Sequence, residues 1–118
     1  EVVSRFNLYI PLGFQELITC DVIIVPGGTG NMRRSVVTNW GGLASGETYN
    51  AVVDGIAAGE VAVTTDWMMA IDISDALLGA PPASPGDVVG VAFTRHGDHA
   101  NDTVGADCYL IGLRLRYV

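Results

Sequence analysis

The sequence predicts an all-β domain, an antiparallel β-sandwich of about seven or eight strands, for which we expect a jelly-roll arrangement. First, 15 glycines and 5 prolines are spread along the chain and divide it into short segments. Second, several of these segments alternate apolar and polar residues with the two-residue period of a strand that has one buried face. Third, no segment longer than about two turns has helical periodicity, and the strand–helix alternation typical of parallel sheets is missing.

The first third of the chain contains three segments with the character of strands. Residues 2–10 alternate, residues 17–25 are β-branched and nearly continuously apolar, and residues 32–40 alternate again. A nearly continuous apolar segment is typical of a strand that is buried on both faces. Glycine and proline dominate residues 26–31, so we expect a turn there, with a hairpin between the second and third strands.

The middle of the chain has weaker signals. Residues 49–53 and 59–65 are expected to form two short strands, because Asp54 and Gly55 between them are a turn signal. In residues 67–73 the apolar side chains alternate onto one face of a further strand.

The last part of the chain combines a proline-rich loop with two clear strands. Residues 74–78 are expected to form a single helical turn with Ser74 as its N-cap. Residues 79–87 contain three prolines and must be a loop. Residues 88–95 and 107–118 alternate strongly, and we expect them to pair as a closing hairpin.

We expect the core to be built from the inward-facing residues of these segments. Burial of such faces, at about 25 cal/mol per Å², offsets the loss of chain entropy in a domain without a disulfide or a metal. The expected core residues are Phe6, Leu8, Val22, Ile24, Val36, Trp40, Trp67, Met69, Ile71, Val89, Val91, Phe93, Leu110, Ile111, Leu113 and Leu115.

The composition fits one domain, residues 1–118. Apolar residues make up 49% of the chain and charged residues 16%. A domain of this size has little interior, so we expect part of the apolar surplus to cover a subunit contact. No apolar run approaches the roughly 20 residues of a membrane helix, so we expect no membrane partner. The chain begins with Glu1 rather than Met, which is consistent with a piece of a longer protein.

The charge balance argues against nucleic acid as a partner. All 6 basic residues are arginines, and against 13 acidic residues they leave a net charge of −7. A protein that binds a phosphate backbone needs a basic footprint. We therefore expect no nucleic-acid partner.

Two cysteines, Cys20 and Cys108, each lie inside an apolar segment. Free cysteine is among the most buried residue types, so we expect two buried thiols. A disulfide between them is the alternative. Nothing resembles the paired-cysteine pattern of a metal site.

A polar loop between the last two strands holds His96, Asp98, His99 and Asp102. A divalent-metal site is one interpretation. The spacing matches no established metal motif, and we favour a solvated loop. A Ser–His–Asp triad has no support, because no serine lies at a nucleophile elbow and both histidines occupy one loop. We therefore expect a protein that is not an enzyme and that has no cofactor and no metal.

Arg95 and Asp102 stand at the two ends of this loop, at the mouth of the expected hairpin. A cross-strand ion pair there would help to fix the register, with a contribution of up to about 1 kcal/mol. The role that we expect for both residues is structural.

The last third of the chain resembles a known class of protein. Residues 85–87 are Pro-Gly-Asp, a strand then ends in Arg95, and a polar loop leads through Asp102 to a strand with Gly-Leu-Arg-Leu-Arg-Tyr at 112–117. This pattern resembles the closing hairpin of jelly-roll-like β-sandwich modules in structural proteins of tailed bacteriophages. The structural residues that the resemblance implies for this hairpin are Gly86, Asp87, Arg95 and Asp102.

The resemblance implies a non-enzymatic virion protein. It would be a capsid-decorating module, a head-fibre module or a tail-appendage module. Such a module acts in a homo-oligomer, with a trimer favoured, beside other virion proteins. The high apolar and low charged content is consistent with a permanent interface. Four arginines either pair with acidic residues of a neighbouring subunit or lie on solvated strand faces: Arg33, Arg34, Arg114 and Arg116.

The alternative function is a carbohydrate-binding β-sandwich module of a cell-surface or secreted protein, with an extracellular location. Such a module needs exposed aromatic rings as a platform. Most of the available rings fall on positions that we expect to face inward: Tyr9, Trp40, Tyr49, Trp67, Tyr109 and Tyr117. A host-surface glycan is therefore a second candidate partner.

Overall fold

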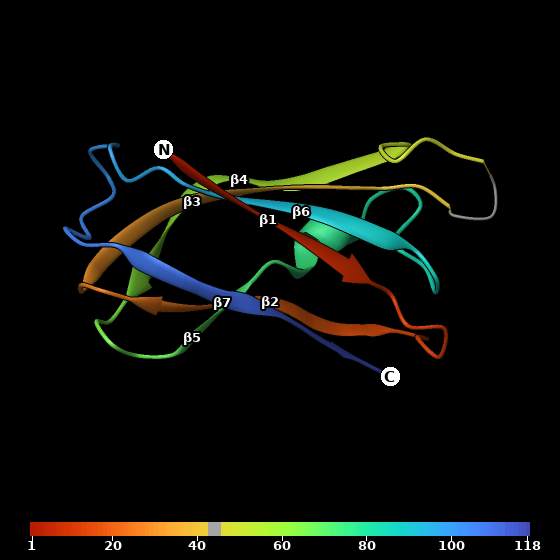
Figure 1. The fold of residues 1–118 in the computed structure, drawn as a ribbon, viewed down its shortest axis with the longest axis horizontal. Helices are drawn as coiled ribbons and strands as arrows, with labels where there is room; N and C mark the ends of the chain where they lie inside the picture. The colour runs from red at the N-terminus through yellow and green to blue at the C-terminus, as the bar shows by residue number, and fades with distance from the viewer. Residues whose placement is uncertain (43–45) are drawn as a thin grey trace.

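The computed structural model describes residues 1–42 and 46–118 and shows two antiparallel sheets packed face to face (Figure 1). Sheet A has four strands in the order β1-β6-β3-β4, and sheet B has three in the order β5-β2-β7. The predicted antiparallel β-sandwich is confirmed. The elements are β1 (Val2–Tyr9), β2 (Leu17–Pro26), β3 (Gly30–Trp40), β4 (Val52–Val63), β5 (Met69–Asp72), the 3-10 helix η1 (Ser74–Leu77), β6 (Val88–Arg95) and β7 (Cys108–Tyr117).

The finer expectation of a jelly roll is not confirmed. β3 and β4 form a hairpin within sheet A, and every other connection between consecutive strands passes from one sheet to the other. A jelly roll has about eight strands in two Greek keys, whereas the described residues form seven. None of these residues lies in a helix long and apolar enough to span a membrane.

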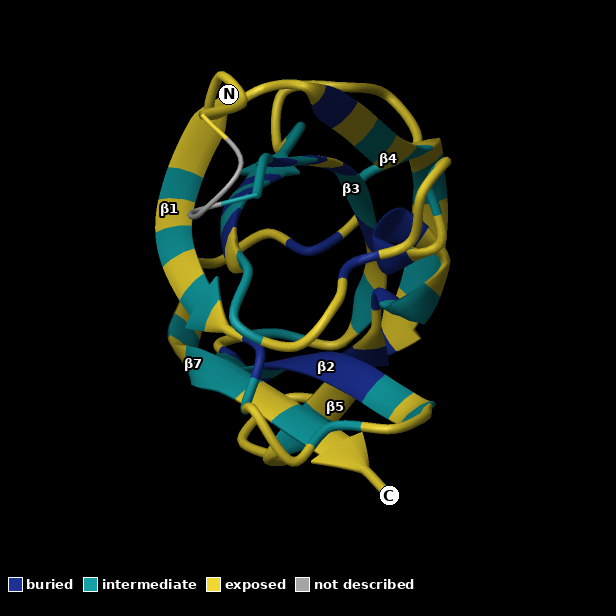
Figure 2. Ribbon diagram, turned by 90° about the vertical axis from the view of Figure 1, so that its right-hand side faces the viewer, coloured by how far each residue is buried: buried dark blue, intermediate teal, exposed yellow. Residues whose placement is uncertain are grey.

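The core lies between the two sheets, where the burial is greatest along β2 and β3 (Figure 2). Val22, Met32 and Phe93 are at most 1% exposed. All the predicted core residues are buried or packed against the buried cluster, with the exceptions of Trp67 and Ile111. The alternation of the sequence therefore predicts the core well on both sheets.

Ile111 is exposed because β7 contains a β-bulge. Leu110 and Gly112 pair with consecutive residues of β2, which leaves Ile111 as an extra residue. A bulge shifts the alternation of side chains between the two faces. Strict alternation would place Tyr109, Ile111 and Leu113 on one face, but Leu110 and Leu113 pack against the core, whereas Tyr109 is exposed.

Trp67 is exposed because it lies in the turn before β5 and not in a strand. Its amide donates to the carbonyl oxygen of Thr64 at 3.2 Å, which closes this turn. The strand expected over residues 67–73 is shorter and begins at Met69.

β4 is a single strand where two strands and a turn were expected. Asp54 and Gly55 lie inside it. A Cβ atom at Gly55 would lie 2.5 Å from the carbonyl oxygen of Val36 on β3, so this glycine marks a close approach of two backbones rather than a turn. The register between β3 and β4 shifts beside it, between Arg34 and Val36.

Two predicted hairpins are wrong, the one between residues 17–25 and 32–40 and the one between residues 88–95 and 107–118. β2 and β3 lie in different sheets, and so do β6 and β7. β2 pairs with β7, and β3 pairs with β6. The turn after β2 and residues 96–107 therefore carry the chain between the sheets.

η1 closes one side of the sandwich and is bonded to both sheets. The amide of Ile73 donates to the carbonyl oxygen of Cys20 on β2 at 2.8 Å, and the amide of Cys20 donates to Ser74 Oγ at 2.9 Å. On β3, Thr38 Oγ1 donates to the carbonyl oxygen of Ala76. The expected N-cap at Ser74 is wrong, because Ile73 is the N-cap residue and the hydroxyl of Ser74 accepts from β2 instead.

Replacement of Thr38 by valine is expected to destabilise the domain. Thr38 is buried, and valine leaves the carbonyl oxygen of Ala76 without its donor inside the core. We expect the free energy of unfolding to fall by about 1–3 kcal/mol, as measured by urea denaturation. Thr94→Val, on the outer face of β6, is the matched control and should change stability by less than about 0.5 kcal/mol. Equal losses in the two variants would contradict the role of Thr38.

Candidate functional site

The carboxylate of Asp102 holds the connection between β6 and β7. Its side chain is 0% exposed, and Arg95 Nε and Nη2 donate to its two oxygens at 3.1 and 2.9 Å. The amides of Arg33 and Val104 donate to the same carboxylate at 3.0 and 3.2 Å. Arg95 also donates to the carbonyl oxygens of Val104 and Ala106, both at 2.7 Å. The cluster therefore joins β3, β6 and the connection itself.

These contacts determine how Asp102 titrates. Burial alone raises the pKa of a carboxyl group, but the hydrogen bonds from Arg95, Arg33 and Val104 and the charge of Arg95 outweigh it and hold the pKa of Asp102 below its ordinary value. The hydrogen bond to Asp102 in turn raises the pKa of Arg95, against the effect of burial. Both groups are charged in the folded protein.

The four predicted hairpin residues lie in two different places. Arg95 and Asp102 meet at the crossover to sheet B. Gly86 and Asp87 form the turn before β6, where Gly86 has a φ of +85°, in the left-handed region that favours glycine. The amide of Gly86 donates to the carbonyl oxygen of Ile10 at 2.8 Å, and the carbonyl oxygen of Asp87 accepts from the amide of Ile10 at 2.9 Å. This turn is therefore fixed against the end of β1.

Arg114 pairs with an acidic residue of its own chain. Its Nε and Nη2 donate to Asp21 Oδ2 at 3.2 and 2.9 Å, from β7 to the neighbouring β2. Asp21 is buried, whereas Arg114 stays half-exposed on the outer face of sheet B. The guanidinium of Arg114 thus covers the carboxylate of Asp21 on the outer face of sheet B.

The other candidate interface arginines differ in their partners. Arg33 Nη1 donates to Glu60 Oε2 at 2.6 Å, and Arg116 Nε donates to Thr19 Oγ1 at 2.8 Å. The Nε atom of Arg34 is buried and has no hydrogen-bond partner in the part of the chain that the structure describes. Contacts of these arginines with a neighbouring subunit stay a prediction.

The polar loop brings His96 between Ser35 and Glu1. His96 Nε2 lies 2.9 Å from Ser35 Oγ, and His96 Nδ1 lies 3.2 Å from Glu1 Oε2. Serine, imidazole and carboxylate follow the order of a nucleophile, its base and an orienting acid. Ser35 lies inside the central strand β3, however, and not at a turn that frees backbone amides for an oxyanion. These contacts attach the N-terminus to sheet A, and Glu1 is a residue that the sequence analysis missed.

The remaining polar residues of the loop do not converge on a metal. His99 Nδ1 accepts from the amide of Asn101 at 3.0 Å, and Asp102 belongs to the ion pair with Arg95. Within residues 1–42 and 46–118, no three histidine, cysteine or carboxylate side chains come together to hold a metal ion.

Both cysteines are free thiols. Cys20 is buried, and burial, with the charges of Asp21 and Asp72, raises the pKa of its thiol to about 12. Cys108 is partly buried, and burial raises its pKa as well. A raised pKa lowers the fraction of thiolate, so neither cysteine is activated as a nucleophile.

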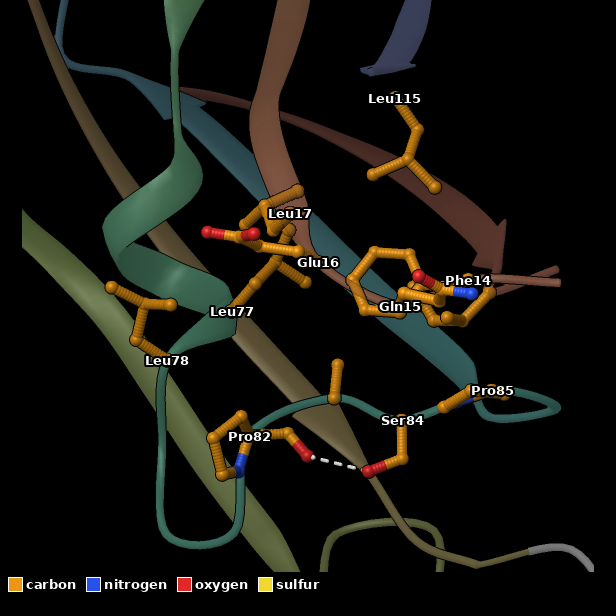
Figure 3. Close-up of a pocket in the computed structure, with 12 residues that line it drawn as sticks. Phe14, Gln15, Glu16, Leu17, Leu77, Leu78, Pro82, Ser84, Pro85 and Leu115 are labelled. Atoms are coloured by element: carbon orange, nitrogen blue, oxygen red, sulfur yellow. Dashed lines mark hydrogen bonds between the residues drawn. The ribbon is translucent and has the colours of Figure 1, made fainter. Parts of the chain in front are cut away.

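A cavity of about 410 Å³ opens at one end of the sandwich, beside η1 (Figure 3). Phe14, Leu17, Leu77 and Leu115 give it a mainly apolar wall. Ser84 also lines this cavity. Its hydroxyl donates a hydrogen bond to the carbonyl oxygen of Pro82 in the same loop, at 3.1 Å.

The outer face of sheet B carries an apolar patch. Met68 lies just before β5, next to Met69, and its side chain is exposed. Tyr109 pairs with Val25 across β2 and β7. We call the following outward residues the sheet-B patch: Ile23, Val25, Met68, Ala70, Tyr109 and Ile111.

The outer face of sheet A carries a hollow of about 380 Å³. In the sheet, Asn7 on β1 pairs with Gly90 on β6, and Gly90 pairs with Asn39 on β3, so the two asparagines flank a glycine in one row. We call this cavity the sheet-A hollow, and it is lined by Asn7, Asn39, Gly41, Gly42, Glu47, Tyr49, Val88 and Gly90.

Aromatic residues are more exposed than the sequence predicted. Trp40 is the buried one among the six rings considered as a platform. Tyr9 is exposed as the alternation of β1 predicts, since Phe6 and Leu8 face the core. The other exposed rings lie at a strand end, in a turn, in the β3–β4 connection or beside the bulge. The exposed rings are Tyr9, Tyr49, Trp67, Tyr109 and Tyr117.

Asp102→Asn is expected to lower the free energy of unfolding by about 3 kcal/mol, because Arg95 keeps its charge and loses its buried partner. The pKa of Asp102 is depressed in the folded state, so its contribution is complete above the unfolded-state value of about 3.9 and is lost as the pH falls through the lower, folded-state value. Wild type should therefore lose stability in acid more steeply than the variant. Denaturation at a series of pH values measures this, with exposed Asp107→Asn as control; identical pH profiles would contradict it.

Arg114→Ala is expected to lower stability by about 1–3 kcal/mol, since the buried carboxylate of Asp21 loses both of its donor bonds from the guanidinium. Arg116→Ala, on the same face of the same strand, removes a bond to the hydroxyl of Thr19 and should cost less than about 1 kcal/mol. Urea denaturation of the two variants compares them, and a larger loss at Arg116 would be the contrary result.

Comparison with known proteins gives no match: no family model, no curated protein and no solved structure matches this chain.

Proposed function

We propose that this domain is a non-enzymatic structural module that assembles into a homo-oligomer through the sheet-B patch. We further propose that it belongs to the virion of a tailed bacteriophage, as a capsid-decorating, head-fibre or tail-appendage module. The exposed sheet-B patch supports the assembly. The sequence pattern of residues 85–117 supports the virion, although β6 and β7 lie in different sheets and so do not form the closing hairpin of the resemblance. A trimer is the oligomer that this resemblance favours.

The sheet-B patch is continuous across three strands. Ile23 of β2 pairs with Ala70 on β5, and Val25 pairs with Tyr109 on β7. Met68, Tyr109 and Ile111 are 73%, 61% and 60% exposed. Monomeric soluble proteins rarely leave a large contiguous apolar area in water. Burial of this face against another molecule accounts for the high apolar content of so small a chain.

Polar residues border the patch on the same face. Asp21 pairs in register with Asp72 on one side and with Arg114 on the other, and Arg116 follows beyond them. An apolar centre with a polar border is the usual anatomy of a protein interface. The half-exposed guanidinium of Arg114 retains room for a second carboxylate, so it supports the prediction of intersubunit pairing.

A second copy of the chain is the partner that fits this face. The chain carries a net charge of −7, and like charges oppose the approach of two copies. The six residues of the patch are uncharged, so two copies can meet there with little repulsion at the centre of the contact.

Light scattering coupled to size-exclusion chromatography tests the assembly. We expect the wild type to be an oligomer, and we expect Ile111→Asp and Met68→Asp to be folded monomers by circular dichroism, because both side chains are exposed in the single chain. Val3→Asp, which changes an exposed valine on the edge strand β1 of sheet A, is the matched control and should remain oligomeric.

A wild type that stays monomeric at high concentration would remove the assembly proposal. An oligomer that survives both patch variants would remove sheet B as the interface. The virion proposal is tested separately by mass spectrometry of purified phage particles from the source sample, in which the chain should be a stoichiometric component; its absence from the particles would be the contrary result.

A further inference from the structure

We propose that the sheet-A hollow binds a neutral oligosaccharide. The proposal goes beyond assembly, because the hollow lies on the opposite outer face of the sandwich from the sheet-B patch. It is carried by the row Asn7–Gly90–Asn39 and by the exposed tyrosines beside it.

Gly90 forms the floor of the hollow. A Cβ atom at this position would lie 2.8 Å from Oδ1 of Asn39, so the carboxamide of Asn39 occupies the space above the glycine backbone. Asn7 flanks the same glycine from the edge strand β1. Because residue 90 has no side chain, the carboxamides of Asn7 and Asn39 both lie beside its backbone.

Both carboxamides are available to a ligand. Neither the side chain of Asn7 nor that of Asn39 has a hydrogen-bond partner among residues 1–42 and 46–118. A carboxamide offers two donors and an acceptor, which matches sugar hydroxyl groups, since each hydroxyl both donates and accepts. A pair of such groups at a fixed separation orients a ring that bears several hydroxyls.

Aromatic side chains border the hollow. Tyr49 lines it and is 76% exposed. Tyr9 is 52% exposed and lines an adjoining cavity of about 570 Å³, which shares Gly41 and Glu47 with the hollow. An exposed tyrosine offers an apolar ring beside a polar hydroxyl, and the C–H face of a sugar packs on such a ring. Two adjoining cavities accommodate an oligosaccharide better than a single sugar.

The charge of the site selects a neutral ligand. The described residues that line the two cavities include the carboxylates of Glu47 and Asp87 and no arginine. Together with the net charge of −7, these carboxylates repel phosphorylated or acidic glycans. The floor of glycine and carboxamide is too polar for a lipid chain, which would leave these groups without partners.

NMR titration of the labelled full chain tests the proposal, with cellohexaose, maltohexaose, xylohexaose and chitohexaose as the probes. We expect at least one of them to shift the resonances of Asn7, Asn39, Tyr49 and Gly90, with millimolar affinity. Asn39→Ala and Tyr49→Ala should each weaken this binding at least about tenfold, or 1.4 kcal/mol. Asn31→Ala changes an exposed asparagine on the same face of the same strand and should bind like wild type.

Gly90→Ala supplies a second test that removes no polar group. The added methyl displaces the carboxamide of Asn39 and should abolish binding, whereas Gly105→Ala, where a Cβ meets nothing within 4 Å, should not. Shifts with none of the four probes, shifts confined to another surface, or unchanged binding in Asn39→Ala and Tyr49→Ala would each overturn the proposal. Light scattering separates sugar binding from assembly. The variants of Asn39, Tyr49 and Gly90 should remain oligomeric, and Ile111→Asp should still bind the sugar.

Discussion

The buried carboxylate of Asp102 fixes the place where the chain passes from sheet A to sheet B. Removing a charge from water costs several kcal/mol, and this cost is offset only where hydrogen bonds satisfy the oxygens. Arg95 and two backbone amides do so here. Because the other donors of Arg95 hold the carbonyl oxygens of Val104 and Ala106, the same ion pair sets the path into β7. The register of β7 beside β2, and with it the composition of the sheet-B patch, depends on that path.

Local alternation is enough to predict most strands and most of the core, because it reports which side chains face inward. Arg95 and Asp102 do meet, but not across the expected hairpin, because Asp102 lies in the connection between two different sheets. Alternation does not predict the features that depend on backbone from elsewhere in the chain. Gly55 looks like a turn until Val36 is seen to approach it, and Ile111 looks like core until the bulge opposite β2 is known. The hollow was missed for the same reason: Asn7 and Asn39 are ordinary outward polar residues until strand pairing places Gly90 between them.

The two outer faces of the sandwich differ in chemistry. Sheet B presents uncharged apolar side chains across three strands, and sheet A presents asparagine carboxamides beside a glycine floor. In the proposed assembly, burial of one face leaves the other in solvent. Under the two proposals, the module would attach to its own copies through sheet B and bind sugar through sheet A, so the two functions would lie on separate sheets.

The connections between the sheets also have a consequence for how the chain reaches this structure. β1 pairs with β6 and β2 pairs with β7, so neither sheet can be completed from one contiguous half of the sequence. Pairing of distant segments requires closure of long loops before any contact is gained, which is the condition for slow folding. During synthesis, β1 leaves the ribosome well before its partner β6 exists, and β2 leaves it well before its partners β5 and β7. A chain that stops before β7 would complete sheet A but leave β2 paired with β5 alone.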